Sequence, residues 1–126
     1  MRIQHVLIGA LLSATSLCAF AKVIHFDAQT YDQLRHEGTP FIVHTDATWC
    51  PICKKQNDLL TSIEQEPRFR QLTVLVVDVD ADKEVMKSLD LSKRSLFIVY
   101  KGDAELGHSM ADTDKDSIES LFAKAR

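Results

Sequence analysis

Residues 46–55 read Asp-Ala-Thr-Trp-Cys-Pro-Ile-Cys-Lys-Lys, and this stretch decides the fold. The run before it, 41–45, is apolar with little alternation, which is typical of a strand covered on both faces. After it, apolar residues recur at helical spacing, so we predict a helix over 50–65. Pro51 suits the first turn, where a missing N–H costs nothing. The stretch therefore places two cysteines, spaced C-x-x-C, where a strand passes into a helix.

The rest of the chain alternates between the two patterns. The sequence predicts strands over 23–26, 41–45, 72–79, 96–100 and 104–110. It predicts helices over 28–36, 50–65, 82–89 and 114–125. Early strands that alternate with helices pair in parallel, and the final two form an antiparallel hairpin. We therefore expect an α/β fold, with one central mixed sheet and helices on both faces.

Length and composition limit the possible functions. The chain has 126 residues, which allows one domain, with 45% apolar and 26% charged residues, as in ordinary globular proteins. The formal net charge is −3. Because no basic patch occurs, we expect no nucleic-acid partner.

The N-terminal residues have the pattern of a secretory signal peptide. Arg2 precedes an apolar run that begins at Val6, and Ala19-Phe20-Ala21 fits a small-x-small cleavage site. A membrane anchor is the alternative, but the run is shorter than the roughly 20 apolar residues that span a bilayer. We expect residues 1–21 to be removed, leaving a 22–126 domain in the periplasm without stable membrane insertion.

Removal of the leader also removes Cys18, so only Cys50 and Cys53 remain. A disulfide across so short a loop constrains the unfolded chain little, so a redox role explains the pair better than a stabilising one. The first cysteine lies at a helix N-terminus, where the macrodipole favours a thiolate. We predict Cys50 as the nucleophile and Cys53 as the resolving thiol, with their disulfide as the redox group and no other cofactor.

The element order, the Trp-Cys-Pro-Ile-Cys-Lys motif of residues 49–54 and the hairpin at Tyr100-Lys101-Gly102 resemble thioredoxin. The resemblance covers roughly residues 23–124. It implies a thioredoxin-like thiol–disulfide oxidoreductase that acts on protein cysteines. Trp49-Cys50, and the lack of the large helical insertion found in DsbA-type oxidants, favour a reductant supplied by a membrane redox partner.

Two positions depart from the family pattern. His44 occupies the place of a buried acid that relays a proton to the resolving cysteine, so it is either a relay itself or a packed strand histidine. Ser95 occupies the place of a cis-proline, so we expect a trans Arg94–Ser95 bond and a rearranged loop. Arg94 either lies beside Cys50 and lowers its pKa or points to solvent. We expect substrate to bind at four residues: Trp49, Pro51, Arg94 and Ser95.

Two other functions stay open. The first is a metal or iron–sulfur protein; two cysteines cannot complete a tetrahedral site, so His44 or a second chain would have to supply ligands. Loss of the proline would then expose the cysteines to metal. The second is a thioredoxin-like binding module whose cysteines are vestigial.

Overall fold

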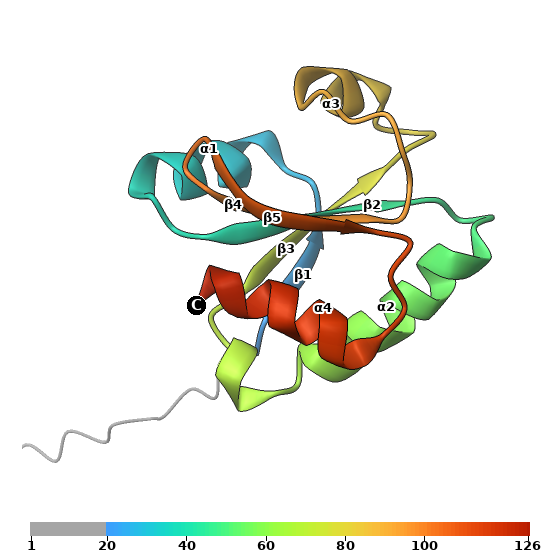
Figure 1. Ribbon diagram of the computed structural model, residues 1–126. Coiled ribbons are helices and arrows are strands. Elements are labelled where there is room, and N and C mark those ends of the chain that lie inside the picture. The colour runs from blue at the N-terminus through green and yellow to red at the C-terminus, as the bar shows by residue number, and fades with distance from the viewer. Residues whose placement is uncertain (1–19) are drawn as a thin grey trace, which may run out of the picture.

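One mixed sheet lies at the centre of the molecule (Figure 1). The computed structural model describes residues 20–126, and its sheet has the strand order β1-β3-β2-β4-β5. The strands are β1 (Lys22–His25), β2 (Phe41–Asp46), β3 (Thr73–Asp78), β4 (Leu96–Lys101) and β5 (Ala104–Met110). β3 pairs in parallel with β1 and β2, whereas β4 is antiparallel to both β2 and β5. The predicted mixed sheet with an antiparallel C-terminal hairpin is confirmed.

Helices cover both faces of this sheet, as predicted (Figure 1). α1 (Ala28–Glu37) and α3 (Lys83–Ser88) lie on one face, and α2 (Pro51–Ile63) and α4 (Lys115–Phe122) lie on the other. Two short 3-10 turns, η1 (Pro67–Phe69) and η2 (Ala123–Ala125), follow α2 and α4. The predicted boundaries mostly differ from these by one or two residues. The closing helix is shorter than predicted because its last residues form η2.

The alternation of side chains along β2 creates a separate core on each face. Ile42 packs with residues of α2 and α4, including Leu60 and Ile118. Phe41 points the other way and packs beneath α1 and α3. Since β2 is buried on both faces, its end is held firmly, and the cysteine motif begins there.

The predicted signal peptide lies almost entirely outside the described residues. Its last residue, Ala21, is buried, and its N–H donates to the Glu64 carbonyl at 3.3 Å. Between residues 20 and 126, no helix is long and apolar enough to cross a membrane.

Candidate active site

Cys50 is the N-cap of α2 rather than its first residue. Its backbone is extended, with φ −91° and ψ 114°, and its sulfur accepts the N–H of Cys53 at 3.2 Å. Pro51 follows in the first turn. The sulfur therefore caps a helix N-terminus, where unpaired N–H groups favour negative charge. The sequence placed the cysteine at this end of the helix, and the structure shows that its sulfur is the capping atom.

The pKa values of the two thiols are shifted in opposite directions, down for Cys50 and up for Cys53. Burial raises the pKa of Cys50, but hydrogen bonds from the Cys53 thiol, the Ser95 hydroxyl and the Cys53 N–H, together with the Arg94 side chain, lower it to about 7. Burial and the neighbouring Cys50 sulfur raise the pKa of Cys53. At neutral pH the pair can thus hold one thiolate, on Cys50, and one proton, on Cys53.

Ser95 connects both sulfurs to the loop before β4. Its hydroxyl lies 3.4 Å from Cys50 Sγ and 3.2 Å from Cys53 Sγ. No cis peptide bond occurs within residues 20–126, so Arg94–Ser95 is trans, as predicted. Ser95 has φ +64°, in the left-handed region that non-glycine residues seldom occupy. The loop therefore places a hydroxyl within reach of both sulfurs.

Gln56 holds this loop in place, and the sequence analysis missed it. The side chain is fully buried, and its amide donates to the Ser95 carbonyl at 3.1 Å and the Asp112 carbonyl at 3.0 Å. It thereby joins the segments before β4 and after β5. The signal was its position three residues after Cys53, which puts it on the inner face of α2.

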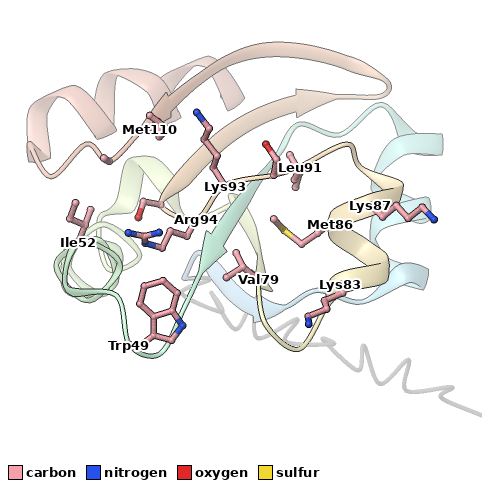
Figure 2. A pocket seen from close by; sticks show the side chains of 13 residues that line it. Trp49, Ile52, Val79, Lys83, Met86, Lys87, Leu91, Lys93, Arg94 and Met110 are labelled. Carbon is pink, nitrogen blue, oxygen red and sulfur yellow. The ribbon is translucent and has the colours of Figure 1, made fainter.

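The side chains of Trp49 and Arg94 lie next to each other at the cysteine motif (Figure 2). The Arg94 guanidinium stacks over the Trp49 ring at 4.7 Å, and the indole N–H donates to Asp80 at 2.7 Å. Trp49 is 58% exposed, whereas Cys50 is only 3% exposed. A substrate sulfur therefore reaches Cys50 only after neighbouring side chains shift.

His44 is fully buried under α2 and stacks on Phe97 at 4.4 Å. Its Nδ1 lies 3.0 Å from the Leu96 carbonyl, and its Nε2 lies 3.2 Å from Asn57 Oδ1. The Asn57 amide in turn donates to Asp46 at 3.2 Å. Burial lowers the pKa of His44. No hydrogen bond in the described part of the chain joins its ring to either sulfur; Asn57 lies one helical turn beyond Cys53.

Three of the four predicted substrate-binding residues line one groove, and the fourth does not. Trp49, Arg94 and Ser95 line a groove of about 760 Å³ beside the cysteines. Pro51 is exposed in the first turn of α2, and its neighbour Ile52 lines the groove in its place.

The metal alternative finds no complete ligand set. Within residues 20–126, no three His, Cys, Asp or Glu side chains gather closely enough to hold an ion. His44, the candidate third ligand, has both ring nitrogens in hydrogen bonds.

The arrangement matches one class of chemistry. A thiolate stabilised at a helix N-terminus, with a second thiol one turn further in, can form a mixed disulfide and then release it. The fold and the site together define a dithiol–disulfide exchange protein.

Comparisons with known proteins agree with this class. The family model described as Thioredoxin matches residues 22–124. Thioredoxin H2-1 of rice, Oryza sativa subsp. japonica, is 31% identical over 107 residues, which cover 82% of this chain and 75% of the rice protein. Thioredoxin of Chlamydia muridarum is 30% identical over 78 residues, covering 62% of this chain and 74% of that protein.

A solved structure is similar over most of its length. The crystal structure of Trxlp from Edwardsiella tarda superposes with a TM-score of 0.74 at 29% identity, covering 79% of this chain and 98% of that one. The chain belongs to the thioredoxin family, and it is a thioredoxin-like thiol–disulfide oxidoreductase with the Cys50–Cys53 pair as its C-x-x-C motif.

Proposed function

We propose that this protein is a periplasmic reductant of protein disulfides. The observation that supports this direction of electron flow is the set of contacts at the Cys50 sulfur. The N–H of Cys53 and the Ser95 hydroxyl are among the hydrogen bonds that lower the pKa of Cys50 to about 7. Thioredoxin, a reductant, has a nucleophilic cysteine of pKa about 7, whereas the oxidant DsbA has one of about 3.5. A thiolate that is only moderately stabilised leaves the dithiol state easier to oxidise, which suits an electron donor.

The reaction conserves atoms and electrons. The Cys50 thiolate attacks one sulfur of a substrate disulfide; that S–S bond breaks, a mixed disulfide forms and one substrate thiolate leaves. Cys53 loses its proton and attacks Cys50 Sγ, which forms the Cys50–Cys53 disulfide and releases the second substrate thiolate. Two electrons pass from the protein to the substrate.

Equilibration of the Cys50–Cys53 pair with glutathione tests the direction. We expect a reduction potential near about −270 mV; one near about −120 mV would mark an oxidant and overturn the proposal. Cys50→Ser should abolish reduction of a neutral disulfide such as hydroxyethyl disulfide. Cys53→Ser should instead accumulate the mixed disulfide. A wild-type rate no higher than that of Cys50→Ser would refute the enzyme activity itself.

We infer that His44 assists the removal of the proton that Cys53 must lose, without a direct hydrogen bond from its ring to either sulfur. Both ring nitrogens face acceptor oxygens, and a neutral ring has only one N–H, so a second proton would satisfy both contacts. Burial opposes that protonation, so a proton taken up there is readily given back.

His44→Gln retains hydrogen-bonding groups but cannot titrate, and it should slow turnover by about tenfold or more and change the pH profile. His44→Ala should do the same if it folds. The exposed His25 provides a control, since His25→Ala should alter neither. An unchanged profile in His44→Gln would remove the residue from the mechanism.

The location and the electron supply are also proposals. Arg2, the apolar run from Val6 and the Ala19-Phe20-Ala21 site support export. N-terminal sequencing of protein from the periplasmic fraction should begin at Lys22; cytoplasmic protein that retains Met1 would contradict export.

A membrane redox partner would keep the exported pair reduced. Alkylation trapping in intact cells should then find free thiols, and a fully oxidised pair would contradict that partner.

A further inference from the structure

The groove that Trp49, Arg94 and Ser95 line also has a large apolar part (Figure 2). It has a volume of about 760 Å³ and runs from the cysteine motif toward α3 and the end of β5. Trp49, Ile52 and Met110 line it and are 58%, 38% and 53% exposed. Three of the six large hydrophobic side chains that are exposed among residues 20–126 therefore gather at this one groove.

The charged side chains that line the groove are all cationic. They are Lys83, Lys87, Lys93 and Arg94, and no acidic residue lines it. None of the four is in an ion pair with another residue of the described part of the chain. The nearby Asp80 accepts the indole N–H of Trp49. The protein has a formal net charge of −3, so a groove lined by four cations and no acid differs from the molecule as a whole.

The backbone at Ser95 offers nothing to a bound chain. Its N–H donates to the Thr45 carbonyl at 2.9 Å, and its carbonyl accepts the N–H of Ala111 at 2.9 Å and the amide of Gln56. Ser95 itself can therefore contribute only its side chain to the recognition of a bound substrate. The side chains that line the groove are apolar or positively charged, apart from the hydroxyls of Ser92 and Ser95.

We propose that the groove selects substrates by charge, an inference that rests on the proposed reductase function. The preferred substrate is an extended polypeptide whose disulfide-bonded cysteine is flanked by acidic residues, with an apolar residue close by. The apolar side chain packs against Trp49 and Met110, and the carboxylates lie over Lys83, Lys87 and Lys93. Binding then removes apolar surface of both partners from water. The lysines attract the acidic substrate and so raise its association rate.

Matched peptides test the selection. Each carries one apolar residue and one cysteine capped as a disulfide with mercaptoethanol, flanked either by Asp or by Lys. At low salt, reduced wild-type protein should react about tenfold faster with the Asp peptide, and salt should shrink the difference. The whole-molecule charge predicts the opposite order. Equal rates, or a faster Lys peptide, would overturn the proposal.

Paired variants locate the effect. Lys83→Gln/Lys87→Gln should lower the ratio of the Asp to the Lys rate about threefold. Lys22→Gln/Lys101→Gln makes the same charge change at the opposite end of the sheet and should leave the ratio unaltered. An equal fall of this ratio in both double variants would show an effect of net charge and would refute selection by the groove.

Two further measurements distinguish a failure of the proposed substrate selection from a failure of the proposed reductase function. Wild-type protein that reduces hydroxyethyl disulfide but does not distinguish the peptides refutes the selection and retains the reductase. Protein inert toward that neutral disulfide refutes the reductase, and the selection with it. If a second copy of this chain covers the groove instead, the protein should elute as a dimer and react equally with both peptides, which also overturns the proposal.

Discussion

At Cys50, opposing effects act on one sulfur atom. Burial alone would keep the thiol protonated, and the capping N–H, the Ser95 hydroxyl and Arg94 more than compensate for it. The attacking residue is thus tuned by contacts from two separate segments, the start of α2 and the loop before β4. Changes in that loop should alter the chemistry without touching either cysteine.

Arg94→Ala should raise the pKa of Cys50 above about 7, because the side-chain hydrogen bond from Arg94 that favours the thiolate is lost. Below pH 7 the rate of alkylation by iodoacetamide should fall about twofold to threefold. Thiolate absorbance across a pH titration measures the pKa directly. Arg94→Lys keeps the charge and should keep the pKa, and Lys93→Ala serves as the neighbouring control. An unshifted titration in Arg94→Ala would leave Arg94 without a role in activating the thiol.

Ser95→Pro should destabilise the protein by more than about 1 kcal/mol, although proline is the family's residue here. Proline requires φ near −65°, whereas Ser95 has φ +64°, and its N–H bonds Thr45. Ser95→Gly accepts that φ and should stay within about 1 kcal/mol of wild type. Urea unfolding measures both. A proline variant as stable as the wild type would mean that the loop can change its conformation.

At the scale of elements, a four-charge cluster joins the end of α2 to α4. Glu66 accepts from Lys115 at 2.7 Å and from Arg68 at 2.8 Å, and Glu119 pairs with both cations. Hydrogen bonds from Lys115 and then Arg68 lower the pKa of Glu66 to about 2. Because Glu66 is partly exposed, solvent weakens the stabilisation that this pKa implies.

Glu66→Gln should therefore cost about 1 kcal/mol at neutral pH. The folded pKa lies below the ordinary carboxyl value, so the stabilisation is present above about pH 4.5 and is lost as the pH falls toward 2. Unfolding curves of wild type and variant should converge across that window. Glu64→Gln removes a neighbouring carboxylate that makes no ion pair with the described residues, and it should have little effect. Parallel pH curves for Glu66→Gln would show that the cluster contributes nothing.

At the scale of the whole molecule, a cluster of packed aromatic rings and the redox-active cysteines lie at opposite ends of β2. Phe41 begins β2, is fully buried, and packs between Tyr31 at 5.5 Å and Tyr100 at 5.6 Å. Cys50 follows the other end of the same strand. The rings of Tyr31, Phe41 and Tyr100 therefore lie away from the redox pair.

Phe41→Ala should cost about 3–5 kcal/mol because it leaves a cavity, and Phe41→Leu should cost less. The pKa of Cys50 should stay at about 7 in both variants if they fold. Denaturant unfolding and thiolate titration give the two quantities independently. A change in the pKa that tracks the loss of stability would show that the two ends of the strand are coupled.

The sequence by itself determined the α/β order of elements, the antiparallel hairpin and the position of the cysteine pair at the start of a helix. Those features depend on local periodicity and on residues a few positions apart, which the chain order fixes. The resemblance identified His44 and Ser95 as unusual, because they depart from a family pattern at known places in the chain, and it pointed to Arg94 as a candidate neighbour of Cys50.

Only the tertiary structure decided what those residues touch. The hydroxyl shared by two sulfurs, the amide of Gln56 that fixes the loop, and the lysines of α3 beside Trp49 join segments 30 or more residues apart. Hydrogen bonds and local fields act over a few ångströms, so their partners follow from packing between elements, which periodicity along the chain does not specify.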